Sequence, residues 1–111
     1  MRFSNGARAT ISISQVSSGR KNSINWEISG PEGSLAFDSE NPEQLWIGHR
    51  GRANEVLHKD PGMLSPDAAR TAFYPGGHVE GFSETFRGLF ERVYEDINNG
   101  TQSNSYPTFA D

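Results

Sequence analysis

Cysteine is absent from the 111 residues, and lysine and arginine form no cluster anywhere along them. The first absence excludes a disulfide framework and any metal site that depends on thiolates. The second argues against a surface for nucleic acid or anionic membranes, since such surfaces concentrate positive charge and this chain has a net charge of -4. No apolar run approaches the roughly 20 residues that cross a membrane. These absences favour a soluble, cytoplasmic protein whose partners include no nucleic acid and no membrane.

Hydrophobic residues are also scarce, at 33% of the sequence. The length of 111 residues corresponds to one domain. A domain that folds alone usually has a larger apolar share. We therefore expect either long loops or an apolar partner that lies outside this sequence.

The strongest periodic pattern predicts one amphipathic helix from Phe82 to about Asn99. When successive residues are placed about 100° apart, apolar side chains fall on one stripe and charged side chains on the other side. The stripe consists of Phe82, Phe86, Leu89, Phe90, Val93, Tyr94 and Ile97. Gly100 suits the left-handed position that ends a helix. The stripe needs a broad apolar surface, so we expect the helix to lie across one face of a sheet.

Short alternating segments predict that sheet. The first is Ala7–Ser14, whose even and odd positions differ in polarity and which follows Asn5-Gly6, the preferred pair for a tight hairpin turn. Its partner strand would begin before Met1, so the domain is expected to be cut at its front. Four more strands are expected around Ile24–Ile28, Leu35–Phe37, Leu45–Ile47 and Glu55–His58. The short turns between them imply an antiparallel meander.

The expected fold class is therefore α+β, with an open-faced, mostly antiparallel sheet and a long amphipathic helix packed on one face. Ser65-Pro66-Asp67 predicts a short capped helix before the long one. In the tail, Tyr106 and Phe109 are expected to lay their rings back on the body. The other face of the sheet would carry polar side chains and either meet water or pack on another subunit. Those side chains are Arg8, Thr10, Ser12, Asn25 and Glu27.

An ordered set of segments carries a family resemblance over essentially the whole chain. The segments are Phe3–Ala7, Ile13–Gln15, Gly19–Asn22, Gly30–Leu35, Pro42–Gly48, Tyr74–Phe82 and Tyr106–Phe109. Together they resemble the C-terminal domain of the Gfo/Idh/MocA family. The resemblance implies an NAD(P)-dependent dehydrogenase or reductase of sugars or cyclitols, with a Rossmann domain in its N-terminal half. Residues 1–111 would then form one C-terminal domain for substrate binding and oligomerisation, truncated at its front and its end, with the Rossmann domain absent.

The hydride-transfer motifs of that family do not occur here. There is no G-x-G-x-x-G fingerprint, neither Lys21 nor Lys59 lies in a Glu-Lys-Pro motif, and there is no Asp-x-x-x-His. We therefore expect no catalytic residue in this chain, no cofactor bound by it alone, and NAD or NADP bound by the full-length enzyme. The implied partners are the Rossmann domain of the parent protein, a small polyol or sugar, and further copies that assemble through the sheet face.

Three groups of side chains are candidates for substrate binding. His78 follows a Pro-Gly-Gly turn near the start of the long helix and could hydrogen-bond a sugar hydroxyl, or else cap the helix or satisfy a nearby carbonyl. Arg20, Lys21 and Asn22 offer directional donors for a polyol, or else form a solvated hairpin tip. Tyr74 could stack on a sugar ring or pack against the helix.

Other signals are weak. The histidines are too widely scattered to predict a metal site. Glu80 and Glu84 are interpreted as first-turn acids favoured at a helix N-terminus. The alternative function is a non-catalytic carbohydrate-binding or protein-interaction module that retains the fold. A glycine-rich strand-turn-helix upstream in the coding frame would favour the enzyme, and a true start at Met1 would favour the module.

Overall fold

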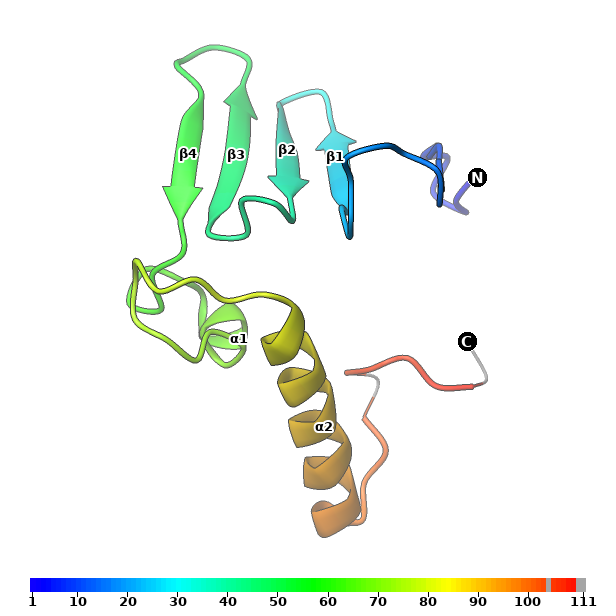
Figure 1. The fold of residues 1–111 in the computed structure, drawn as a ribbon, viewed down its shortest axis with the longest axis vertical. Coiled ribbons are helices and arrows are strands. Elements are labelled where there is room, and N and C mark those ends of the chain that lie inside the picture. The colour runs from blue at the N-terminus through cyan, green and yellow to red at the C-terminus, as the bar shows by residue number, and fades with distance from the viewer. Residues whose placement is uncertain (104, 110–111) are drawn as a thin grey trace.

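The chain forms a four-stranded antiparallel sheet followed by two helices (Figure 1). The structure is a computed structural model that describes residues 1–103 and 105–109. The strands are β1 (Asn25–Ser29), β2 (Gly33–Asp38), β3 (Gln44–His49) and β4 (Glu55–His58), and the helices are α1 (Pro66–Ala69) and α2 (Phe82–Asn99). The sheet order β1-β2-β3-β4 is the predicted meander, so the α+β class and four of the expected strands are confirmed.

The register of the sheet makes one of its faces apolar. Residues paired across antiparallel strands share a face. One row of paired residues consists of Trp26, Phe37, Leu45 and Leu57, and the next of Ile28, Leu35, Ile47 and Glu55. The rings of Trp26 and Phe37 stack with centroids 5.7 Å apart. Asn25 and Glu27 lie on the other face, as the alternation predicts.

Both helices begin and end where the sequence indicates. The hydroxyl of Ser65 accepts the N–H of Ala68 at the start of α1. At the start of α2 the Glu84 carboxylate accepts the N–H of Gly81 at 2.9 Å, which satisfies a donor that the helix itself leaves unpaired. Gly100 ends α2 with φ of 62°, the left-handed conformation that glycine adopts without strain.

The predicted strand Ala7–Ser14 is wrong. A bridge between Arg2 and Arg8 closes the expected turn at Asn5-Gly6, but no strand continues from it in the part of the chain that the structure describes. Ile13 is 88% exposed. The alternation shows which side chains would share a face, whereas a strand also needs a neighbour to take up its backbone hydrogen bonds. Residues 10–14 have no such neighbour among the described residues.

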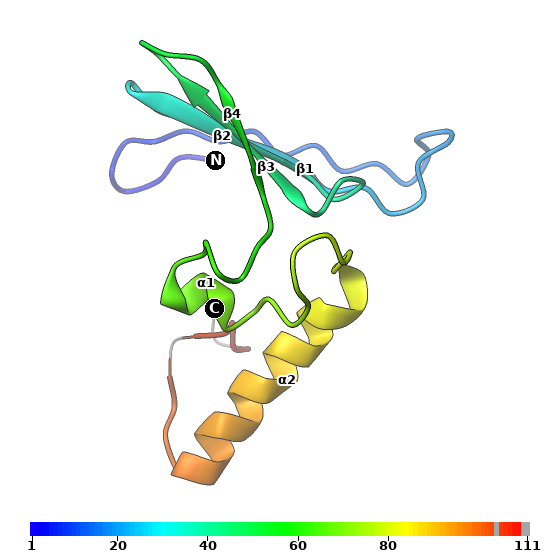
Figure 2. The same cartoon turned by 90° about the vertical axis from the view of Figure 1, so that its left-hand side faces the viewer.

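The helix α2 does not lie across the sheet as expected. No Cα atom of α2 comes within 8 Å of a Cα atom of the four strands, all of which belong to the described residues. Figure 1 and Figure 2 show α2 extending away from one end of the sheet. Its apolar stripe is exposed, with Phe82 at 69% and Ile97 at 66%. The amphipathic pattern determines which side of a helix is apolar but not which surface covers that side.

Candidate functional site

The ammonium group of Lys59 joins the sheet to the loop that precedes α2. Lys59 follows β4 directly, and its Nζ donates to the carbonyl oxygen of His78 at 2.9 Å and to that of Tyr74 at 3.4 Å. It also forms a hydrogen-bonded ion pair with the carboxylate of Glu80, and Glu43 Oε2 lies 3.5 Å away. The side chains of Lys59 and Glu80 are only 14% and 8% exposed. We call Lys59, Glu80 and Glu43 the lysine joint.

Glu80 completes this joint by binding the backbone on both sides. Its Oε1 accepts the N–H groups of Phe73 and Tyr74, while its own N–H donates to Glu43 Oε1 at 2.8 Å. Burial opposes ionisation of Glu80, but the hydrogen bonds from Lys59 and Phe73 outweigh it, so the pKa of Glu80 is lowered. Burial likewise opposes the charge of Lys59, yet Glu80 leaves the pKa of Lys59 raised. Both groups are therefore charged at neutral pH.

The interpretation of Glu80 as a first-turn helix acid is therefore wrong. Glu80 precedes the helix cap at Gly81 and is paired with Lys59, while Glu84 occupies the helix position that the sequence indicated. Local sequence patterns do not indicate the lysine joint, because its three members are separated by 16 and 21 residues and form no local motif. The only signal is a charged residue that directly follows a predicted strand.

The turn Tyr74–His78 presents two of the candidate side chains. The N–H of His78 donates to the carbonyl of Pro75 at 3.2 Å, and Gly77 takes a φ of 80° that favours glycine. His78 Nδ1 lies 3.4 Å from the carbonyl oxygen of Gly76. The side chains of Tyr74 and His78 are both exposed. Lys59 thus fixes the backbone of a turn whose side chains remain accessible.

The other candidates, Arg20, Lys21 and Asn22, lie in a separate exposed loop. Arg20 forms an ion pair with Glu40 in the turn between β2 and β3. Within the described residues, no hydrogen bond or ion pair joins residues 20–22 to the turn Tyr74–His78. The structure thus brings Tyr74 and His78 together and leaves the three loop residues apart. Their contact with a substrate stays a prediction.

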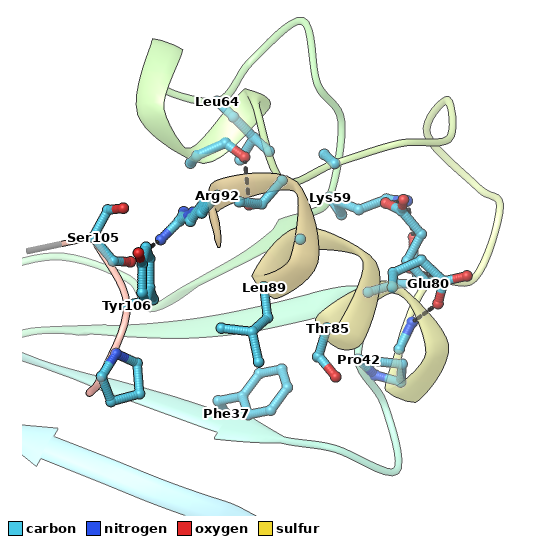
Figure 3. A pocket seen from close by; sticks show the side chains of 18 residues that line it. Phe37, Pro42, Lys59, Leu64, Glu80, Thr85, Leu89, Arg92, Ser105 and Tyr106 are labelled. Carbon is cyan, nitrogen blue, oxygen red and sulfur yellow. Dashed lines mark hydrogen bonds and ion pairs between the residues drawn. The ribbon is translucent and has the colours of Figure 1, made fainter. Parts of the chain in front are cut away.

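A cavity of about 520 Å³ lies between the sheet end, both helices and the tail (Figure 3). Phe37, Pro42 and Leu89 contribute to apolar walls. Lys59 and Glu80 of the lysine joint lie at one end, and Arg92 and Tyr106 lie at the other (Figure 3). None of the five candidate residues lines this cavity.

Asp96 holds the tail against the end of α2. Its carboxylate accepts the hydroxyl of Thr101 at 2.8 Å and both the N–H and the hydroxyl of Ser103, at 2.7 and 2.9 Å. The N–H of Ser103 contributes most to lowering the pKa of Asp96, and the hydrogen bond to Asp96 raises the pKa of Tyr106. Tyr106 is half-buried and lines the cavity, so its ring lies on the body as expected, but Phe109 is fully exposed. Only one of the two predicted rings therefore lies on the body.

The described residues form neither a metal-binding cluster nor a membrane-spanning helix. No group of three or more His, Cys, Asp or Glu side chains in residues 1–103 and 105–109 is arranged to hold a metal ion. In the same part of the chain, neither helix has the length and hydropathy needed to span a bilayer.

The fold and the motifs both match a known class of protein. The family described as the C-terminal alpha/beta domain of an oxidoreductase family matches residues 1–111. An oxidoreductase from Sinorhizobium meliloti has a TM-score of 0.76 and 31% identity over 86% of this chain. An inositol dehydrogenase homologue from Azotobacter vinelandii, solved with NADH and myo-inositol, has a TM-score of 0.64 and 26% identity over 80% of this chain. No curated protein matches the chain.

These matches define an α/β domain of an oxidoreductase. The chain belongs to the Gfo/Idh/MocA oxidoreductase family and corresponds to its C-terminal domain. It covers 27% of the Sinorhizobium meliloti protein and 26% of the Azotobacter vinelandii protein, or about a quarter of each.

Proposed function

We propose that this chain is the substrate-side part of an NAD(P)-dependent sugar or cyclitol dehydrogenase or reductase. The observation that carries the proposal is the likeness to an inositol dehydrogenase homologue that was solved with both NADH and myo-inositol. In this proposal the chain is a truncated domain, and a Rossmann domain in the same polypeptide carries hydride transfer. In this proposal NAD or NADP binds to the Rossmann domain and accepts or donates the hydride. The cofactor is assigned to that domain because residues 1–111 contain no glycine-rich fingerprint.

The turn Tyr74–His78 has the chemistry that polyol binding needs. The imidazole of His78 is exposed and can exchange a hydrogen bond with a hydroxyl group, while the exposed ring of Tyr74 can cover the apolar face of a sugar. Lys59 donates hydrogen bonds to the backbone carbonyls of Tyr74 and His78, so the backbone that carries both side chains is held in place. Arg20, Lys21 and Asn22 are a second set of donors for the same ligand.

The enzyme hypothesis is tested on the full-length polypeptide with a panel of sugars and cyclitols and either nicotinamide cofactor. Appearance of reduced nicotinamide with at least one polyol is the expected result. The isolated chain is titrated with NADH and NADPH in parallel and should show no saturable binding. Full-length protein that turns over no polyol, or micromolar cofactor binding by the isolated chain, contradicts the proposal.

A histidine substitution tests the site itself. In the full-length enzyme, His78→Ala should raise KM about tenfold, the cost of one lost hydrogen bond of roughly 1.4 kcal/mol, and change kcat and the melting temperature little. Val79→Ala is the matched control, because Val79 is the next residue along the chain and is 72% exposed, but its side chain has no hydrogen-bonding group. An unchanged KM with a lowered melting temperature assigns His78 to structure instead.

The same proposal assigns contacts between enzyme copies to the sheet face that bears Glu27, Trp46 and Val56. Ala36, Trp46 and Val56 form a row across three strands on this otherwise polar face. Trp46 is 37% exposed and Val56 is 49% exposed, so the row has no complete cover. Val56→Arg in the full-length protein should therefore lower its mass in solution, measured by light scattering. An unchanged mass places the contact elsewhere.

A further inference from the structure

The two segments that carry the candidate substrate residues are both bonded to one turn of the sheet. This β2–β3 turn consists of residues 39–43. Figure 1 shows that the start of β1, the β2–β3 turn and the end of β4 lie at the same end of the sheet. Within the described residues, the loop at residues 20–22 and the turn Tyr74–His78 share no hydrogen bond or ion pair, but each is tied to the β2–β3 turn.

The first end of the β2–β3 turn holds the loop. The hydroxyl of Ser39 accepts the N–H of Ile24 at 2.8 Å, and the N–H of Ser39 donates to the carbonyl of Ile24 at 3.0 Å. Glu40 forms an ion pair with Arg20, whose two side chains are exposed. Because exposed ion pairs contribute little, the two hydrogen bonds of Ile24 provide most of this attachment.

The second end of the β2–β3 turn holds the segment that bears His78. Glu43 Oε1 accepts the N–H of Glu80 at 2.8 Å, and the carbonyl of Glu43 accepts the N–H of Lys59 at 2.8 Å. Lys59 in turn donates to the carbonyl oxygens of Tyr74 and His78. The side chain of Glu43 is only 17% exposed, so its loss would leave the N–H of the buried Glu80 without an acceptor.

Hydrogen bonds within the β2–β3 turn brace it between these two ends. The carboxylate of Asp38 accepts the N–H of Glu40 at 2.9 Å, and the carbonyl of Asp38 accepts the N–H of Asn41 at 2.9 Å. The carbonyl of Asn41 accepts the N–H of Gln44 at 3.1 Å, and the ring of Pro42 fixes its own φ angle. Movement at one end of so short and braced a turn is therefore transmitted to the other end.

We propose that the β2–β3 turn positions both sets of substrate-binding side chains for one polyol, and that Glu43 and Glu40 are positioning residues of this site. The inference rests on the proposed function, in which both sets bind the same ligand. Glu43 acts through Tyr74 and His78, and Glu40 acts through Arg20, so neither glutamate touches the substrate. A shared support holds the two sets at a fixed separation before the ligand binds, which lowers the entropic cost of binding.

Kinetics of the full-length enzyme test the role of Glu43. Glu43→Ala should raise KM for the polyol about tenfold and change kcat little, the loss expected when one hydrogen bond that supports a binding side chain is removed. Glu43→Gln keeps the side-chain oxygen that accepts the N–H of Glu80, so its KM should stay close to that of the wild type. In a background with Tyr74→Ala and His78→Ala, Glu43→Ala should change KM little further. An unchanged KM in Glu43→Ala, or an equal change in both backgrounds, overturns the proposal.

A second set of variants tests the role of Glu40 without disturbing a buried group. Glu40→Gln should raise KM about twofold, because the pair it breaks is exposed, and this effect should vanish when Arg20→Ala is also present. Glu55→Gln is the matched control and should leave KM unchanged, because Glu55 forms a similarly exposed pair with Arg52 near the opposite end of β3. Equal values of KM in Glu40→Gln and Glu55→Gln contradict the role of Glu40.

Hydrogen exchange without substrate tests the shared support itself. Glu43→Ala removes the acceptor of the Glu80 N–H, so exchange at Glu80 should become faster, and exchange at Ile24 should become faster as well through the braced turn. Faster exchange at Glu80 alone shows that the two segments are supported separately, which overturns the proposal. Absence of polyol turnover by the unsubstituted enzyme is a failure of the proposed function, and the exchange rate of Ile24 distinguishes that failure from the absence of a shared support.

Discussion

Removing the charge of Glu80 should loosen the turn that carries the candidate substrate residues. Among the described residues, Glu80→Gln leaves Lys59 with Glu43, 3.5 Å away, as its only carboxylate partner, in a place where the lysine side chain is 14% exposed. Breaking one side of a buried ion pair costs about 3 kcal/mol at the low end of measured values. Opening of residues 73–80 should therefore become roughly 150-fold more frequent, since about 1.4 kcal/mol corresponds to a factor of ten.

Hydrogen exchange in the full-length protein measures that opening directly. The informative amides are those of Phe73, Tyr74 and Glu80, since each donates to a carboxylate of the lysine joint. Glu91→Gln is the matched control because it breaks the exposed pair with Arg87, whose expected cost is below about 0.5 kcal/mol. Equal exchange in the two variants would refute the reasoning.

The pH dependence of the same variant provides an independent check. The pKa of Glu80 is lowered from 4.5, so its stabilising effect is complete above pH 4.5 and declines as the pH falls through the folded pKa. The pKa of Lys59 is raised from 10.5, so its effect is complete below that pH and is lost only at higher pH. The difference between wild type and Glu80→Gln should be constant near neutrality and shrink below pH 4.5.

Two further substitutions test the C-terminal end of α2 in the same protein. Gly100→Ala should destabilise the end of the helix by about 1 kcal/mol through backbone strain alone, because an added Cβ would meet no atom within 4 Å. Gly51→Ala, equally open but without a left-handed backbone, should change the free energy of unfolding much less in chemical denaturation. Asp96→Asn should speed hydrogen exchange at Ser103, and this difference should shrink as the pH falls below 3.8, because the pKa of Asp96 is lowered and its anchoring is lost in acid. Glu95→Gln, in an exposed pair with Arg70, is its control, and equal effects of the two would contradict the anchoring role.

Local patterns were sufficient to predict the helix and four strands. The stripe and Gly100 define α2, and short alternating runs between tight turns define β1 to β4. In each case the decisive interactions lie between residues close in sequence or in adjacent strands. The family resemblance, drawn from an ordered set of turns and short motifs, is confirmed over residues 1–111.

The expectations that failed depend on partners distant in sequence or outside it. Ala7–Ser14 alternates like a strand but has no neighbouring strand to bond. The aromatic stripe of α2 specifies an apolar cover without specifying which segment provides it. The lysine joint depends on Glu43, Lys59 and Glu80 meeting in space, which no spacing in the sequence indicates.

The candidate site could be predicted only in part. The Pro-Gly-Gly turn and its histidine stand out in the sequence, and the structure places Tyr74 and His78 on one exposed turn. The sequence did not show that Arg20 is held by Glu40 in another loop. It also did not show that Lys59, which belongs to no sequence motif, fixes the backbone of this turn.

Lys59 donates hydrogen bonds to the main-chain carbonyl oxygens of residues 74 and 78, and not to their side chains. Any amino acid at either position offers the same oxygen to the ammonium group. Under the proposed function, these two side chains can therefore change during evolution, and with them the contacts to the substrate, while the path of the turn stays constant.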